Sequence, residues 1–252
     1  MTLHSFNRWT AFVAHFAISV LIAATVFGLV AWLWYPAPYF KAMGGDTLLR
    51  LLIGVDVTLG PLVTLIIFDT SKPRLRQDLA IVATLQVAAL AYGSYVMFDA
   101  RPVYNVFVKD RFETVAANSI DPGSLGKAAA QYQALPLGGP RVVAAHLPKD
   151  ASEAATIAMA AGLGGPDVAN MPHLYESYAG VAQNAAKASR PLVSLSQKGR
   201  DAASAINDFL TANGNGARSL GYLPVRARNR DFAVVVDRKS GEIVGYLPLD
   251  PW

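Results

Sequence analysis

Asp56 is the residue with the strongest case for chemistry, because it is the one acidic side chain in an otherwise apolar stretch, residues 51–68. A carboxyl group at mid-depth in a bilayer costs ~2.5–3.5 kcal/mol on insertion scales, so it should face protein groups rather than lipid. Gln86 lies at a comparable depth in the apolar stretch 79–98, and Thr58 is near Asp56 in sequence. Two interpretations remain open: an Asp56–Gln86 hydrogen bond that fixes a helix bundle, or a polar anchor for another protein's membrane helix.

Small residues and a proline lie around Asp56. Gly54 and Gly60 allow helices to approach closely, and Pro61 leaves a backbone carbonyl without its usual donor. These features fit the docking of a partner helix and equally fit internal packing. Asp56, Gly60, Pro61 and Gln86 are therefore the candidate partner-binding residues of the apolar region.

Three arginines, Arg226, Arg228 and Arg230, alternate along a predicted strand. Such charges can discourage pairing at a sheet edge, which is the interpretation we favour. They can also form a docking stripe for an acidic partner, so the three arginines are kept as candidate partner-binding residues.

The sequence predicts no catalytic site, no cofactor and no metal site. Cysteine is absent, which excludes disulfides, thiolate nucleophiles and Cys-based zinc sites. His146 and His173 have no metal-binding motif around them, and no GxSxG nucleophile motif occurs. The net charge is +4, but residues 99–252 carry 16 basic and 14 acidic side chains, a net of only +2. We therefore expect no nucleic-acid partner and no enzyme activity.

Apolar residues gather in three stretches near the N-terminus, at 10–34, 51–68 and 79–98. About 20 apolar helical residues cross a hydrocarbon core of ~30 Å. We predict a three-helix transmembrane region over residues 1–98, with spans at about 10–34, 49–68 and 79–98, and membrane lipid as its surroundings. The first stretch has 25 residues without a charged side chain, longer than the core of a signal peptide, so we expect it to be retained.

The loop at 69–78 predicts the orientation of these spans. It is short and holds Lys72, Arg74 and Arg76, and basic residues collect on the cytoplasmic side of a membrane. This places the N-terminus in the cytoplasm and residues 99–252 on the outer side, which is the periplasm in a bacterium.

Residues 99–252 have the pattern of an α+β domain with an antiparallel sheet. β-branched and aromatic residues at 101–108 predict a strand, and those at 232–236 and 242–247 predict a C-terminal hairpin. Helices are expected between them, at 151–163, 174–188 and 196–212. Strands first, helices in the middle and a hairpin last give the α+β class.

Several short motifs occur in a fixed order along the chain: WYPAP at 34–38, Asp56 with GP at 60–61, RPVYNVF at 101–107, DRFE at 110–113, DRKSGEIVG at 237–245 and DPW at 250–252. In this order they resemble the bacterial type IV pilin accessory proteins encoded beside pilin genes. The resemblance implies an inner-membrane protein needed for assembly of its cognate type IV pilin. Such proteins are thought to act as pilin-specific chaperones or accessory factors, not as enzymes.

A pilin has one membrane span and a periplasmic head, so a helix bundle with a periplasmic domain could contact both. The second span and the sheet are expected to do so, and pilus assembly platform proteins are further possible partners. The alternative is a membrane-bound regulatory or sensor subunit that modulates the pilus machinery or another envelope system. It could signal only through a partner, since little of the chain is expected in the cytoplasm. A membrane-tethered periplasmic enzyme would need a convergent polar site, which the sequence does not reveal.

Overall fold

The computed structural model describes residues 7–213 and 219–252. They form two compact units. The helical unit comprises the described residues up to Leu33 together with Gly45–Asp99. The sheet unit comprises Trp34–Gly44 together with the described residues of Ala100–Trp252.

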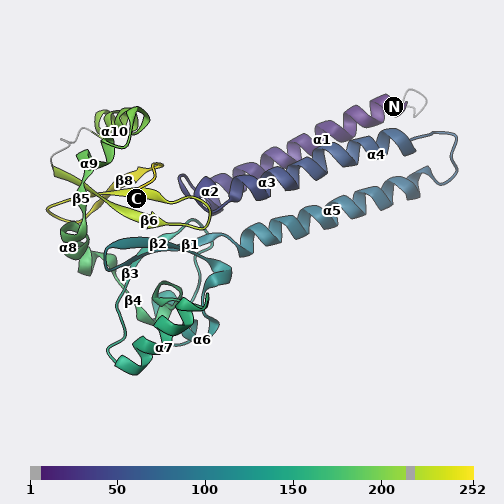
Figure 1. Ribbon diagram of the computed structural model, residues 1–252. Coiled ribbons are helices and arrows are strands. Elements are labelled where there is room, and N and C mark those ends of the chain that lie inside the picture. Colours follow the sequence, from purple (N-terminus) through teal and green to yellow (C-terminus); the bar gives the residue numbers. More distant parts are fainter. Residues whose placement is uncertain (1–6, 214–218) are drawn as a thin grey trace. The chain divides into compact units, whose positions relative to one another are not determined.

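The helical unit contains three long helical segments that run side by side (Figure 1). Each is long and apolar enough to cross a membrane, as the sequence predicts. The segments are α1 (Arg8–Gly28) continued by the π-helical turn η2 (Leu29–Trp34); α3 (Gly45–Gly54), the π-helical turn η3 (Val55–Leu59) and α4 (Gly60–Ile67); and α5 (Leu75–Asp99).

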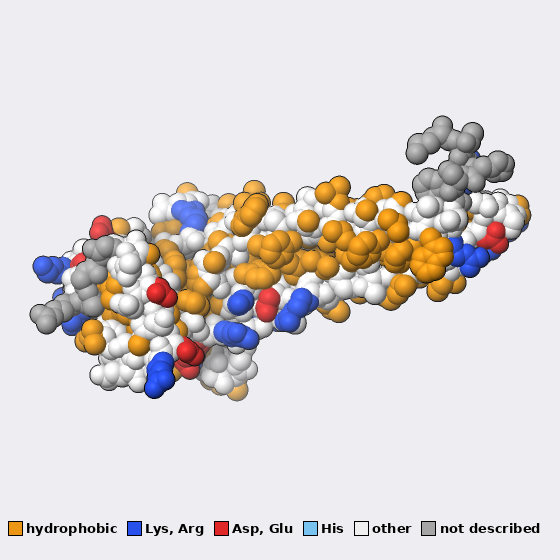
Figure 2. Space-filling model, turned by 90° about the horizontal axis from the view of Figure 1, so that it is seen from above, with side chains coloured by type: hydrophobic (Ala, Val, Ile, Leu, Met, Phe, Trp, Pro, Cys, Tyr) orange, Lys and Arg blue, Asp and Glu red, His pale blue; other side chains and the backbone are white. Residues whose placement is uncertain are grey.

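Within this unit α1 packs against α4 and η3, and α5 packs against α4 and α3. Large apolar side chains on all three segments point outward, among them Leu21, Ile66 and Leu85. Figure 2 shows a continuous band of hydrophobic side chains along the helices on the face in view. An outward apolar surface with hydrogen-bonded helical backbone inside is what a bilayer requires.

The sheet unit is built on one mixed sheet. Its strands follow the order β4-β3-β1-β2-β6-β7-β8, and β5 pairs with β6. The strands are β1 (Pro102–Val108), β2 (Arg111–Ala116), β3 (Arg141–Ala145), β4 (Tyr175–Glu176), β5 (Arg190–Pro191), β6 (Leu220–Arg226), β7 (Phe232–Asp237) and β8 (Ile243–Leu247).

The prediction of an antiparallel sheet was wrong in two places. β1 pairs with β3 in parallel, and β2 pairs with β6 in parallel. Both pairs join strands that are not consecutive in the chain: β2 lies between β1 and β3, and three strands with several helices lie between β2 and β6. Such long connections can return the chain in the same direction. The remaining pairs, including β7 with β8, are antiparallel.

Helices of the sheet unit lie mostly where the sequence predicts them. α7 matches the stretch at 151–163. In the stretch at 196–212 the helix α10 begins only at Arg200, and the stretch at 174–188 begins as β4 and becomes helical at Tyr178. The helices are α2 (Tyr39–Ala42), η4 (Ala117–Ser119), α6 (Pro122–Leu125), η5 (Ala130–Tyr132), α7 (Ala151–Gly162), η6 (Val168–Asn170), η7 (Pro172–Leu174), α8 (Tyr178–Ala188), α9 (Leu192–Ser196) and α10 (Arg200–Asn213).

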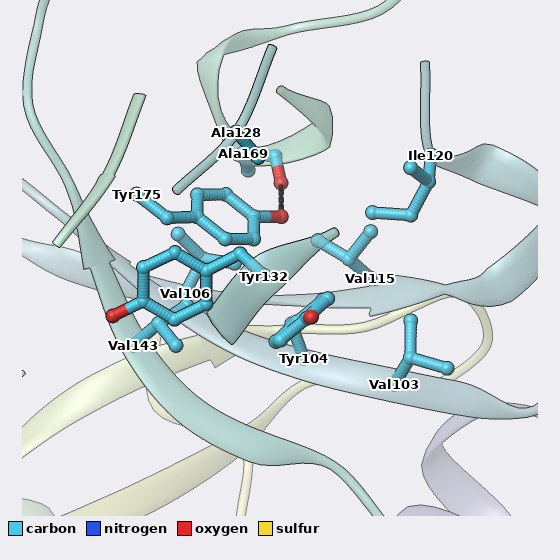
Figure 3. Packing of buried hydrophobic residues seen from close by; sticks show 10 residues of the cluster. All are labelled: Val103, Tyr104, Val106, Val115, Ile120, Ala128, Tyr132, Val143, Ala169 and Tyr175. Atoms are coloured by element: carbon cyan, nitrogen blue, oxygen red, sulfur yellow. Dashed lines mark hydrogen bonds between the residues drawn. The ribbon is translucent and has the colours of Figure 1, made fainter. Parts of the chain in front are cut away.

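Among the described residues, several apolar clusters pack against the sheet. One gathers side chains of β1, β2 and β3 under the helical turns between β2 and β4, including Tyr104, Tyr132 and Tyr175 (Figure 3). The buried hydroxyl of Tyr175 donates to the carbonyl oxygen of Ala169 at 2.5 Å, and burial raises its pKa. A second cluster packs α9 and α10 against β6, β7 and β8 through residues such as Leu195.

The segment Trp34–Gly44 is anchored to the sheet unit. The ring of Tyr39 meets the rings of Phe232 and Tyr246 edge-on, and burial raises the pKa of its hydroxyl. The carbonyl oxygen of Ala42 accepts backbone N–H groups from Asn229 and Arg230, at 2.8 and 3.2 Å. These contacts fix α2 against β7 and the turn that precedes it.

Candidate functional site

The predicted Asp56–Gln86 hydrogen bond is present in the helical unit. The side-chain Nε2 of Gln86 lies 3.2 Å from Asp56 Oδ1 and 3.3 Å from its backbone carbonyl oxygen. Asp56 is only 8% exposed and lies in the π-helical turn η3. Pro61 has no N–H to donate to that turn, so an outside donor to the Asp56 carbonyl replaces part of the missing helical bonding.

Gly60 makes this contact possible. A Cβ atom at Gly60 would overlap the side-chain amide of Gln86, so a larger residue there would displace this amide from Asp56 or move α5. Gly93 has the same relation to the side chain of Leu52, whereas Gly54 faces open space. Gly60 and Gly93 therefore serve packing inside the helical unit, as close helix approach requires.

A second polar contact, which the sequence did not predict, lies one turn further along α4. Nδ1 of His15 on α1 and Oγ1 of Thr64 on α4 are 2.7 Å apart. Ser19, one turn from His15, is buried to 3% exposure. Because Asp56, Gly60 and Thr64 follow one another at four-residue spacing, they form one stripe of the helical segment. The matching spacing of His15 and Ser19 was the signal available in the sequence.

These groups surround hollows between the helices. His15, Ser19, Asp56 and Gln86 line a cavity of about 200 Å³ whose other walls are apolar. Asp56 and Gln86 also border a second hollow of about 320 Å³, lined otherwise by apolar side chains and Gly60. Across residues 7–213 and 219–252, Gln86 supplies the only side-chain hydrogen bond to Asp56. A carboxylate has about four acceptor positions, so Asp56 retains capacity for a further donor.

The prediction that Arg226, Arg228 and Arg230 lie on one strand was wrong for two of the three residues. Arg226 is the last residue of β6, but Arg228 and Arg230 lie in the turn before β7. The alternation reflects a turn, because Arg230 donates its backbone N–H to Ala42 rather than to a neighbouring strand. Arg226 lies opposite Glu113 of β2 in the parallel register. Burial, followed by the charge of Asp167, raises the pKa of the Glu113 carboxyl, and the charge of Arg226 opposes this shift.

A Ser–His–Glu chain lies elsewhere in the sheet unit. Ser124 Oγ is 2.5 Å from His173 Nδ1, and His173 Nε2 is 3.4 Å from Glu153 Oε1. The serine hydroxyl also accepts the backbone N–H of His173 at 3.1 Å. Ser124 is only 2% exposed, so its hydroxyl is not presented to a substrate. The arrangement links α6 to η7, and it lacks the exposed nucleophile that acyl-transfer chemistry needs.

Comparisons with known proteins identify the family of the chain. The family model for "Fimbrial assembly protein FimB" matches residues 4–44. The fimbrial assembly protein of serogroup I from Dichelobacter nodosus is 34% identical over 181 residues, which cover 71% of this chain and 70% of the relative. The chain belongs to the family of fimbrial assembly proteins.

Other relatives from the same organism support this assignment. The fimbrial assembly protein of serogroup E1 is 33% identical over 181 residues, covering 71% of this chain and 70% of the relative. That of serogroups C1 and C2 is 38% identical over 109 residues, covering 42% of this chain and 82% of the relative. No solved structure matches the chain. Membership in this fimbrial assembly family confirms the resemblance to type IV pilin accessory proteins.

The family model locates a segment whose importance the sequence motifs only partly indicated. Its match ends at Gly44, so it spans α1, η2 and the Trp34–Gly44 segment. Tyr35 in that segment is fully buried, and a Cβ at Gly139 would overlap the ring of Pro36. The aromatic and proline residues after the first apolar helix thus pack inside the sheet unit of this fimbrial assembly protein.

Proposed function

We propose that this chain is an inner-membrane accessory protein that binds its cognate type IV pilin and promotes pilus assembly in a chaperone-like manner, without enzyme activity. Membership in the fimbrial assembly family supports a role in building pili. Three helices long and apolar enough to span a membrane support association with a bilayer. The pilin would be held there by its own membrane helix before it enters the pilus.

The proposed orientation has the N-terminus in the cytoplasm and the sheet unit in the periplasm. The His15–Thr64 contact brings the start of α1 near the end of α4, so Arg8 lies at the same end as the loop with Lys72. Hydrogen bonds from Ser71 lower the pKa of the Asp69 carboxyl in this loop, and the charges of Lys72 and Arg8 add to the effect. One end of the helical unit therefore gathers basic residues, which supports a cytoplasmic location for that end.

The observation that carries the proposal is the incompletely satisfied carboxyl group of Asp56. It lies midway along Gly45–Ile67, and Gln86 fills only part of its hydrogen-bonding capacity. Leaving acceptor positions empty within a bilayer is unfavourable, and intramembrane acids are functional candidates for that reason. A hydrogen-bond donor on the pilin helix would complete the set, and the adjoining apolar hollow offers room for its side chains.

Deletion of the gene tests this function. The deletion strain should carry fewer pili or less pilin, while the amounts of unrelated envelope proteins stay unchanged. The wild-type gene supplied in trans should restore both. Normal piliation in the deletion strain would refute the proposal.

Crosslinking in the membrane separates the proposed role from that of a regulator. An accessory protein that holds pilin should crosslink to pilin itself. A regulatory subunit should instead crosslink to assembly platform or signalling proteins.

A further inference from the structure

A hollow of about 550 Å³ lies at the end of β2 in the sheet unit. Strand residues form one side of it, and the last residue of β6 with its following turn forms another. The lining residues are Met43, Glu113, Thr114, Val115, Ala116, Asn118, Ser119, Ala169, Asn170, Arg226, Ala227 and Arg228. The walls therefore combine residues of an extended strand with those of the turns η4 and η6, and they are partly apolar and partly polar or charged.

The strand pairing explains why the hollow is there. β2 pairs with β1 along its length, but its pairing with β6 covers only Phe112 and Glu113. β6 ends at Arg226, which lies opposite Glu113, and the chain then turns toward β7. Within the described part of the chain, residues 114–116 of β2 thus have a neighbouring strand on one side only. An open strand edge is a template for an added extended segment.

The charges beside this edge favour an acidic occupant. Arg226 and Arg228 are both exposed, and neither forms an ion pair with any described residue. Among the lining residues Glu113 is the one acid beside two guanidinium groups, and Asp167, whose charge acts on Glu113, lies outside the lining. Arginine is well suited to bind a carboxylate through paired hydrogen bonds.

We propose that an extended acidic segment of a partner protein docks along residues 114–116 of β2 and places an Asp or Glu side chain between Arg226 and Arg228. Backbone hydrogen bonds to β2 would supply affinity, and the two arginines would select for acidic side chains. The inference deepens the proposed function, since it specifies what the sheet unit contacts. The test of this docking does not involve the contact at Asp56. The docking proposal and the proposed pilin binding at Asp56 can therefore be refuted independently.

The test uses full-length protein in detergent and two pools of short synthetic peptides. In both pools every second position is Val, Ile or Thr. The remaining positions are all Glu in one pool and all Lys in the other. The Glu pool should be retained at least about tenfold better than the Lys pool, equivalent to ~1.4 kcal/mol. Backbone amides of residues 114–116 should exchange hydrogen more slowly with the Glu pool bound, because a strand has been added beside them.

Variants assign the binding to this hollow. Arg226→Gln with Arg228→Gln should abolish the preference for Glu, while Arg200→Gln, at an exposed arginine of α10, should leave it intact. Asn118→Trp keeps every charge but adds bulk at an exposed position of the hollow, and should reduce retention of the Glu pool. Equal retention of the two pools, or retention without slower exchange at 114–116, would overturn the inference. An equal loss in Arg200→Gln would also overturn it.

Discussion

The side-chain amide of Gln86 donates to both the carboxylate and the backbone carbonyl of Asp56, so one residue of α5 satisfies two acceptors in a single turn of the neighbouring segment. That turn is π-helical and precedes Pro61, which cannot donate a backbone hydrogen bond. The contact thus combines a structural role with a carboxyl group that still has room for another donor. Its two roles can be separated by substitution.

Gly60→Ala should destabilise the helical unit. The added Cβ would overlap the Gln86 amide, which must then leave Asp56 or move with α5, and overpacking or a lost buried hydrogen bond of this kind typically lowers the free energy of unfolding by ~1–3 kcal/mol. Thermal unfolding in detergent would measure the change. Gly54→Ala is the matched control, because that position lies in α3 and faces open space. Equal melting temperatures for the two variants would contradict the close approach.

Gly241→Ala should destabilise the sheet unit. Gly241 has a φ angle of 79°, and a Cβ there would overlap the backbone carbonyl of Ala182 in α8. The neighbouring contact, in which Tyr178 donates to the Gly241 carbonyl at 2.6 Å, would be disturbed as well. We expect a loss of more than ~1 kcal/mol in unfolding free energy, measured by chemical denaturation.

Gly180→Ala is the control for that prediction. Gly180 lies in the same helix α8, and its Cβ position is open. Alanine is a better helix former by roughly 0.5–1 kcal/mol, so this variant should be as stable as the wild type or more stable. If Gly180→Ala lowered the free energy of unfolding as much as Gly241→Ala, substitutions around α8 would be destabilising in general. That result would contradict a specific packing role for Gly241.

Glu113→Gln should stabilise the protein more at neutral pH than at acid pH. Burial and the charge of Asp167 raise the pKa of the Glu113 carboxyl above its usual 4.5, so the folded state holds this proton to a higher pH than the unfolded chain does. The protonated carboxyl contributes fully to the free energy of unfolding below the pKa of the unfolded state. This contribution is lost as the pH rises through the pKa of the folded state. Glutamine does not ionise, so the unfolding free energy of the variant does not fall over this pH range for that reason.

Melting temperatures of wild type and Glu113→Gln, compared near pH 4 and near pH 7, would check this pH dependence. The difference in favour of the variant should grow with pH. A difference that shrinks with rising pH would mean that Arg226 and Arg111, which lower the Glu113 pKa, outweigh burial and Asp167.

Ser124→Ala should leave pilus assembly intact as long as the protein accumulates. The hydroxyl of Ser124 is buried and bonded to His173, so its loss removes a link between α6 and η7 rather than a nucleophile. A lost hydrogen bond that leaves partners unsatisfied lowers the free energy of unfolding by ~1–3 kcal/mol. Pilus counts, normalised to the amount of protein in the membrane, are the measurement. Absent pili at normal protein levels would revive an enzymatic role for the Ser–His–Glu chain.

The sequence predicted the parts of the site that stand out against an apolar background. Asp56 and Gln86 are polar residues at similar depth in two apolar stretches, and two such groups are expected to pair. The spacing of His15 and Ser19 places both on one face of α1, but it does not identify Thr64 as the partner of His15. Its pairing depends on the packing of α1 against α4, which sequence periodicity does not specify.

Local patterns also predicted most of the sheet unit's elements but not their long-range pairing. Strand and helix positions follow from nearby residues, whereas the parallel pairs β1–β3 and β2–β6 depend on how long connections return the chain. Arg228 and Arg230 alternate with small or polar residues as strand residues do. Only the backbone contact of Arg230 with Ala42 shows that they belong to a turn.

Copurification of pilin with Asp56 variants tests the central claim most directly. Asp56→Ala should lower the pilin recovered with the membrane protein by roughly tenfold, equivalent to ~1.4 kcal/mol, while the variant still inserts and accumulates. Asp56→Asn, which keeps an acceptor oxygen, should retain part of the binding. Asp46→Ala should bind as the wild type does, because it removes an acid that pairs with Arg50 near the start of the same segment. Unchanged recovery of pilin with Asp56→Ala would contradict the account and leave Asp56 with a structural role alone.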